Sequence, residues 1–159
     1  MRTKASRRKR EARRPGRPRA DETNQRERLL DAAVACFTAE GVAATSLRGI
    51  ALKAGVTPAL VNYYFGSKEQ LLDAFVAERV TPAVQLLRER LMEAGDDPRA
   101  LLGAFVHAIH DVVARFPWWP SLWVREIINE KGTLRDVLHK IIAPQVQQLL
   151  GPALVRAQK

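Results

Sequence analysis

Glycines and capping residues divide residues 24–70 into short segments, and this division constrains the fold more than any other feature of the sequence. Apolar residues recur between Leu29 and Phe37 with the spacing of one helix face. We therefore predict a first helix that begins with Asn24 as its N-cap and ends before Gly41. A helix of this length must bury its apolar face against other helices to be stable.

Three more helix starts follow before residue 70. Thr45 or Ser46 can cap a second helix that ends at Gly55. Pro58 opens a third helix, because proline is tolerated at the first helical position, where its missing N–H costs nothing. The S-x-x-Q sequence at 67–70 is a capping box and opens a fourth helix.

The second half of the chain also has the period of helices. Residues 81–82, Thr-Pro, are expected to break or kink the fourth helix and can start a fifth that ends at Gly95. Residues 98–116 carry the clearest 3.6-residue periodicity. A last helix is predicted after Gly132, interrupted by Pro144. No segment alternates with period two for long enough to predict a strand, so the expected fold is all-α.

The positive charge is confined to the N-terminal arm. Residues 1–19 hold ten of the 26 Lys and Arg residues and one of the 17 acids, so the other 140 residues carry 16 bases and 16 acids. The arm, residues 1–20, has no apolar periodicity and is expected to be disordered when free. A basic arm on a neutral body indicates a polyanionic partner. The absence of a signal peptide or spanning segment and the single cysteine favour the cytoplasm.

Two short helices joined at Gly55, the second opened by a proline, have the sequence form of a helix-turn-helix. Such a pair must turn certain positions inward, and in this sequence those positions hold residues that can be buried. Ala51, where the two helices touch, is small. An ordinary helical hairpin within a bundle core is the alternative interpretation. The inward positions are Ile50, Ala51, Ala54, Val56, Val61 and Tyr64.

Residues 26–75, RERLLDAAVACFTAEGVAATSLRGIALKAGVTPALVNYYFGSKEQLLDAF, resemble the whole DNA-binding domain of the TetR family of bacterial transcriptional regulators. The resemblance implies a helix-turn-helix domain at 21–68 and a helical effector-binding and dimerisation domain at 69–159. It implies a homodimer whose half-sites lie about 34 to 36 Å apart, and a ligand that tilts the fourth helix. The last C-terminal helix of the family looks to be missing, so a weak dimer is expected.

Once the inward residues of the third helix are buried, a polar and small-residue face remains for double-stranded DNA. Asn62 can pair with adenine, and Pro58 and Ala59 can contact a thymine methyl group. The P-G-R-P-R sequence of the arm resembles an AT-hook core that enters the minor groove, with non-specific phosphate attraction as the alternative. The resemblance implies that Arg48 contacts DNA and that Lys68 binds a phosphate. The other predicted DNA-binding residues are Arg17, Arg19, Thr45, Ser46, Thr57, Pro58, Ala59, Asn62 and Tyr63.

Aromatic residues gather in the second half, as expected of an apolar effector pocket between helices, although packing in the core is the alternative for each of them. His107 and His110 lack a third metal ligand nearby, so neither a metal nor a cofactor is expected. Cys36 falls on the inner stripe of the first helix. The predicted ligand-binding residues are Met92, Phe105, Phe116, Trp119 and Trp123.

The function that these features favour is that of a sequence-specific regulator. We expect a repressor that a small apolar or amphipathic ligand releases from a palindromic operator. The alternative is a DNA- or RNA-binding protein without ligand control, in which the C-terminal part serves dimerisation alone. The sequence carries no glycine-rich phosphate loop, nucleophile elbow or metal-spaced cluster, so no enzyme is predicted.

Overall fold

The computed structural model describes residues 20–95, 97–128 and 132–157, and every regular element in these ranges is a helix, which confirms the all-α prediction. No helix in this part of the chain is long and apolar enough to cross a membrane. The elements are α1 (Ala20–Glu40), α2 (Leu47–Ala54), α3 (Pro58–Phe65), α4 (Lys68–Phe75), η1 (Val76–Val80), α5 (Thr81–Glu93), α6 (Pro98–Arg115), α7 (Trp119–Trp123), η2 (Val124–Ile128) and α8 (Arg135–Ala157).

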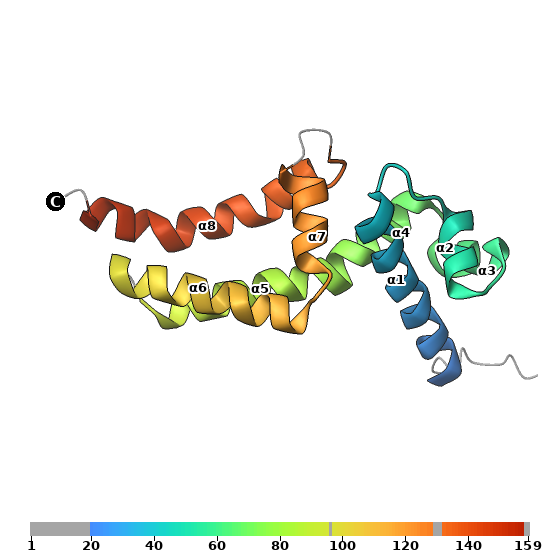
Figure 1. Ribbon diagram of the computed structural model, residues 1–159, viewed down its shortest axis with the longest axis horizontal. Coiled ribbons are helices and arrows are strands. Elements are labelled where there is room, and N and C mark those ends of the chain that lie inside the picture. The colour runs from blue at the N-terminus through green and yellow to red at the C-terminus, as the bar shows by residue number, and fades with distance from the viewer. Residues whose placement is uncertain (1–19, 96, 129–131, 158–159) are drawn as a thin grey trace, which may run out of the picture.

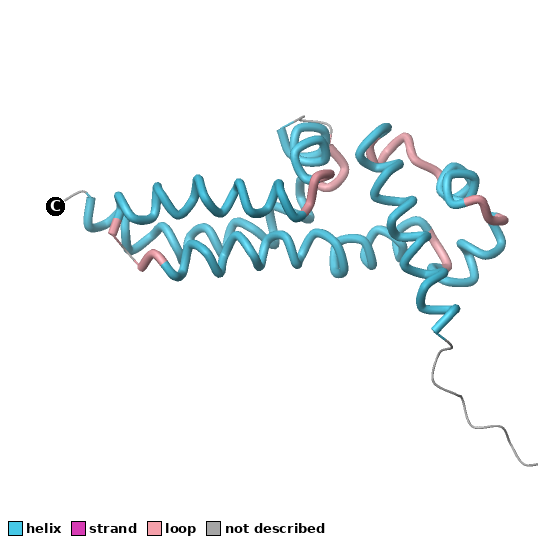
Figure 2. The backbone as a smooth tube through the Cα atoms, turned by 60° about the horizontal axis from the view of Figure 1, so that its bottom comes forward, coloured by secondary structure: helices cyan, strands magenta, loops and turns pink. Residues whose placement is uncertain are grey.

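The helices form two groups along the length of the molecule. Helices α1 to α4, residues 20–75, make up the head, and α2 and α3 lie at the end away from the C-terminus (Figure 1). Helices α5, α6 and α8 run alongside one another toward the other end in both views (Figures 1 and 2). We call the described part of residues 81–157 the body. Helix α7 crosses between the two groups and approaches α1.

Local sequence signals define the helices of the head, as predicted. The Ser46 side chain accepts a hydrogen bond from the N–H of Gly49 at 3.0 Å and caps α2. Helix α2 ends where Gly55 adopts φ +69°, a left-handed conformation that glycine reaches without strain. Pro58 occupies the start of α3, and Ser67 with Gln70 forms the predicted capping box of α4.

Two predicted helix boundaries are wrong, those at Asn24 and at Pro144. Helix α1 begins at Ala20, so Asn24 lies inside it on an exposed position. A fifth helix does begin at Thr81, with Pro82 in its first turn, as predicted. No loop separates it from α4, because η1 joins the two helices and its wider π turn lets the Thr81 N–H bond to the Val76 carbonyl. Helix α8 continues through Pro144, which is exposed, so a carbonyl left without a partner can face water.

One hydrophobic core spans the head and the body. Phe37 of α1 and Phe75 of α4 are fully buried and meet edge to face, with ring centroids 5.1 Å apart. Phe75 also contacts Trp118, just before α7, at a centroid distance of 6.0 Å. The same cluster includes Leu134 and Leu138 at the start of the body's last helix. The two groups of helices therefore share apolar packing rather than a polar interface alone.

We predict that Phe75→Ala lowers the free energy of unfolding by about 3–5 kcal/mol, because it removes a buried ring that both groups of helices contact. Urea titrations followed by far-UV circular dichroism and by tryptophan fluorescence measure the loss. The exposed Leu52→Ala is the control and should change stability by about 0.5 kcal/mol or less. A loss below about 1 kcal/mol for Phe75→Ala would contradict a shared core.

Candidate nucleic-acid interface

The outer face of α3 is exposed, as the sequence predicts. Val61 and Phe65 are buried, whereas Tyr63 is 76% exposed. Helix α3 also lies at the end of the molecule, away from the body (Figure 1). The predicted contact residues that share this exposed surface are Thr57, Pro58, Ala59, Asn62 and Tyr63.

The residues near the start of α2 that were predicted to contact phosphate differ in exposure. Ser46 and Arg48 are exposed, as expected. Thr45 is 2% exposed, and its hydroxyl donates to the Gly41 carbonyl at 2.8 Å. The prediction of Thr45 as a DNA contact is therefore wrong, because its side chain is buried and already bonded inside the loop. From the sequence alone, Thr45 and Ser46 are equally good candidates for the exposed cap of α2, and only the structure shows that Ser46 takes this role.

Lys68 lies at the start of α4, half-buried, and its ammonium group donates to the Ala43 carbonyl at 3.2 Å. This bond ties the loop between α1 and α2 to the N-terminus of α4. The next residue, Glu69, is exposed, and the hydrogen bond from Ser67 lowers the pKa of its carboxyl. The start of α4 therefore carries one positive side chain, Lys68, and one negative side chain, Glu69.

Two sets of ion pairs hold α1 against η1. The Arg26 guanidinium binds both Glu78 oxygens at 2.6 Å and lies over the Phe65 ring, 5.1 Å from its centroid. Arg79 pairs with Glu27 and, at 3.0 Å, with Asp31. The hydrogen bond from Arg26 lowers the pKa of the Glu78 carboxyl. Arg26 thus connects the last residue of α3 with η1. Sequence analysis missed these pairs because the partners lie 48 or 52 residues apart.

The residues predicted to bind a ligand are not brought together. Met92 and Phe105 are exposed. Phe116 is half-buried and lines a surface hollow of about 270 Å³ with Pro82 and Arg115. Trp119 is buried in the main core and stacks on Trp123 at a centroid distance of 5.6 Å. Three of the five residues therefore lie near one aromatic cluster, while the other two face solvent because the helix faces that carry them are not covered.

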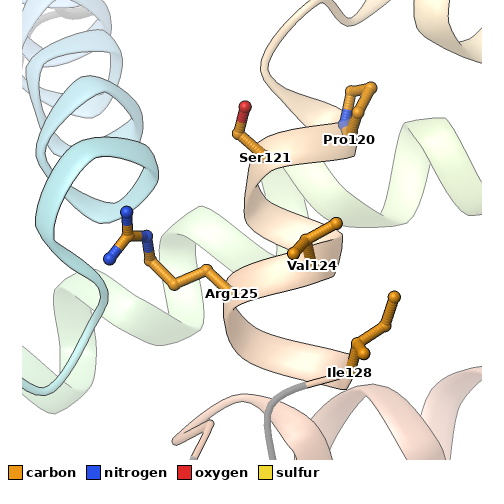
Figure 3. A pocket seen from close by; sticks show the side chains of 5 residues that line it. All are labelled: Pro120, Ser121, Val124, Arg125 and Ile128. Atoms are coloured by element: carbon orange, nitrogen blue, oxygen red, sulfur yellow. The ribbon is translucent and has the colours of Figure 1, made fainter.

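A larger hollow, of about 690 Å³, lies on the outer side of α7 and η2. Its lining comes from a single helical stretch, and the Arg125 side chain points toward α1, away from Val124 and Ile128 (Figure 3). Val124 and Ile128 are exposed apolar side chains. Sequence analysis did not single out this surface, although its apolar positions lie four residues apart. The lining residues are Pro120, Ser121, Val124, Arg125 and Ile128.

The cysteine and the two histidines that could carry chemistry have local structural roles or partners. Burial raises the pKa of the Cys36 thiol, which makes this side chain less reactive. The His107 ring bonds to the Gly103 carbonyl at 2.8 Å, and His110 lies beside Asp111. In the described ranges, no group of three or more potential metal ligands comes together. Arg17 and Arg19 of the arm lie outside the described residues.

Comparisons with known proteins match the head most strongly. The family profile described as "Bacterial regulatory proteins, tetR family" matches residues 29–75. The HTH-type transcriptional regulator BetI of Paraburkholderia xenovorans (strain LB400) is 33% identical over 119 residues, which cover 72% of this chain and 60% of the relative. BetI of Rhizobium meliloti (strain 1021) is 48% identical over 52 residues, 33% of this chain and 26% of the relative.

A solved structure resembles the chain beyond the head. The SmeT–triclosan complex matches with a TM-score of 0.59 and 26% identity over 85% of this chain and 66% of that one. The chain spans no more than 60% of the length of the two BetI relatives. The match to the solved structure thus includes helices of the body as well as the exposed α3.

We predict that Glu78→Gln lowers stability at pH 7 by up to about 1 kcal/mol, the upper range for pairs that water partly screens. Side chains of Arg26 and Glu78 are 33% and 34% exposed. Because the folded pKa of Glu78 is lowered, the pair stabilises the fold above the ordinary value of 4.5 and this contribution is lost as pH falls through the folded pKa.

Unfolding free energies of the variant and the wild type at pH 7 and pH 3 test this. The difference should shrink at the lower pH. Exposed Glu22→Gln on α1 serves as the charge-matched control and should show little difference at either pH. An equal loss for Glu78→Gln at both pH values would show that the ion pair does not cause it.

Proposed function

The chain belongs to the tetR family of bacterial regulatory proteins, and from this membership we propose that it is a sequence-specific DNA-binding transcriptional regulator. In this proposal it acts as a homodimeric repressor in the cytoplasm, and a small apolar or amphipathic ligand releases it from a palindromic operator. The BetI relatives are themselves transcriptional regulators, and the proposal includes no catalytic step.

The exposed surface of α3 is the observation that carries the proposal. Asn62 offers an amide that can bond to both the N6 and N7 positions of adenine, and it is exposed. Pro58 and Ala59 present small apolar groups that suit a thymine methyl group. Tyr63 is long enough to reach a base edge or a phosphate from the same surface. A helix with this combination, held at its inner face by Val61, suits the major groove.

The surrounding residues supply groups for the DNA backbone. Arg48 and Ser46 are exposed at the start of α2, and Lys68 can exchange its bond to the Ala43 carbonyl for a phosphate contact. Thr57 is exposed at the start of α3. In a twofold dimer, the two copies of α3 would enter half-sites about 34 to 36 Å apart, or a multiple of that distance. Arg17 and Arg19 would enter an adjacent minor groove.

The proposed ligand would act on the aromatic cluster of the body. Phe116 and Trp119 both contact Trp118, and Trp118 itself contacts Phe75 of the head. Trp123 stacks on Trp119. A ligand that separated these rings would therefore shift a contact shared with α4. The solved neighbour is a SmeT–triclosan complex, which supports a small-molecule effector as a class. Triclosan is accordingly the first probe for release of this chain from DNA.

One observation favours a second candidate function. Met92 and Phe105 are exposed rather than gathered around a cavity. A DNA- or RNA-binding protein without ligand control, whose body serves dimerisation alone, fits that arrangement.

Selection of bound duplexes from a random pool tests DNA recognition directly. We expect a palindromic sequence to be enriched, because a twofold dimer reads the same half-site twice. Retention of RNA and scrambled duplex to the same extent as the enriched duplex would overturn the proposal. Titration of the bound complex with triclosan then addresses ligand control, and the second candidate gains support if neither release nor a change in tryptophan fluorescence occurs.

We predict that Asn62→Ala relaxes the base preference at one position of each half-site. Loss of a two-bond contact with adenine should cost about 1–3 kcal/mol for the preferred duplex and little for one changed at that position. Competition binding with single-position variants of the selected duplex measures the preference. Gln147→Ala, an exposed amide on α8, is the control and should leave the profile unchanged. A uniform loss across all duplexes would assign Asn62 to the backbone instead.

We predict that deletion of residues 2–19 weakens binding to the selected duplex and to random duplex together. The arm carries ten basic side chains and one acid, and each phosphate that it neutralises adds about 0.9 to the slope of log affinity against log salt concentration. Affinity measured between 50 and 200 mM salt, which spans the usual working range, should show a flatter slope for the truncated protein. An unchanged slope would remove the arm from the interface.

A further inference from the structure

Glu126 of η2 is the one charged side chain that is buried among the described residues with a burial assignment, with 3% of its surface exposed. Its two carboxylate oxygens serve different segments of the chain. Oε1 accepts a hydrogen bond from the Val42 N–H at 2.8 Å, and Oε2 accepts one from the Leu134 N–H at 3.2 Å. Val42 lies in the loop that leads to α2, and Leu134 directly precedes α8. One carboxylate therefore bridges the head and the body.

Glycines let both segments come this close. A side chain at Gly41, which has φ +87°, would stand 3.2 Å from Glu126 Oε1. A side chain at Gly132 would lie 1.9 Å from the Glu126 carbonyl oxygen, which is an overlap with backbone. Gly41 thus approaches the carboxylate of Glu126 and Gly132 approaches its backbone, which leaves little freedom in the geometry of the bridge.

Stability by itself does not require an acid at this position. Burial of a carboxylate is costly, and an apolar side chain of similar volume often serves a core as well or better. An apolar side chain at 126, however, would leave the buried N–H groups of Val42 and Leu134 without an acceptor. In the described ranges no cation is paired with Glu126. The role of Glu126 is therefore to accept hydrogen bonds from the Val42 and Leu134 N–H groups and to hold these two segments at a fixed distance from each other.

The loop on the head side of the bridge is connected to both ends of the helix-turn-helix. Thr45 bonds back to the Gly41 carbonyl through its N–H and its hydroxyl, at 3.2 and 2.8 Å. Lys68 donates to the Ala43 carbonyl and joins the same loop to α4. The loop ends at Ser46, which caps α2. A displacement of Val42 is thereby passed to the start of α2 and, through Lys68, to the start of α4.

We propose that Glu126 is a positioning residue that couples the body to the head, so that a shift of η2 or of the start of α8 moves the 41–46 loop and the helices that follow it. Val124 and Ile128, each two residues from Glu126 along η2, are exposed and line the outer hollow (Figure 3). Occupation of that face would act on the bridge directly. The inference deepens the proposed function by naming the contact through which regulation passes, but its test does not require DNA.

The test is a double-mutant cycle read by amide hydrogen exchange in the full chain. Leu138→Ala perturbs the body, because Leu138 is buried on the first turns of α8. In the wild-type background this change should raise the exchange rates of the Val42 and Thr45 amides by about fivefold or more, the lower range of measured couplings between sites. In the Glu126→Gln background, where the amide can accept only through one oxygen, the added effect of Leu138→Ala should fall to about twofold or less.

Glu89→Gln on α5 is the matched control, since it makes the same change of charge on an exposed side chain. In that background Leu138→Ala should still reach the head with the wild-type effect. The Ala108 and Val112 amides of α6 report general destabilisation, which would raise their exchange by the same factor as that of the head. If Glu126→Gln does not fold, Glu126→Asp, whose shorter side chain cannot span both N–H groups, takes its place in the cycle.

Two results would overturn the proposal. One is an effect of Leu138→Ala on the head that is equal in the wild-type and Glu126→Gln backgrounds. The other is no effect on the head in the wild type. Retention of the selected duplex by the same variants provides a separate measurement. If the wild-type protein does not bind the selected duplex, the proposed function is rejected, and the exchange result still stands. If the wild-type protein binds the duplex but the exchange cycle shows no coupling, only the role of Glu126 is rejected.

Discussion

The edge-to-face contact between Phe37 and Phe75 is the interaction on which the rest of the structure depends. It holds α1 against α4, with the ring centroids 5.1 Å apart, and the far side of Phe75 meets Trp118 of the body at 6.0 Å. Helices α2 and α3 are too short to be stable alone and pack on the surface that this contact organises. Because all three rings share one core, the orientation of the exposed α3 face and the packing of the body are not independent.

Polar contacts around this core set the relative position of the two groups of helices. On one side Arg26 and Glu78 join α1 to η1, and on another Glu126 joins the 41–46 loop to the start of α8. Apolar packing tolerates small shifts, whereas hydrogen bonds weaken steeply when their geometry changes. The π turn of η1, which accommodates Pro82, lies beside the first of these contacts. In the proposed function, the junction between head and body is therefore the part of the protein through which a ligand would act.

Sequence reasoning succeeded where a structure depends on neighbours in the chain. The cap at Ser46, the glycine turn at 55 and the proline at the start of α3 were all predicted, and so was the exposed set on α3, because a helix period determines which residues share a face. It failed at Pro144, where α8 continues without the expected interruption. It also failed at Thr45, whose hydroxyl bonds within its own loop. At these two positions more than one local geometry satisfies the same residues.

The sequence by itself determined the all-α fold, the limits of α2 and α3 and the face that α3 leaves exposed, since caps, glycine turns and helical periodicity act over a few residues. The tertiary structure alone decided which long-range contacts join the parts. Glu126 bonds to a residue 84 positions away and Arg26 to one 52 positions away, and no pattern within the chain pairs such residues. It likewise decided that Met92 and Phe105 face solvent while Trp119 is buried, because burial depends on which helices cover a face, and that is settled by packing rather than by periodicity.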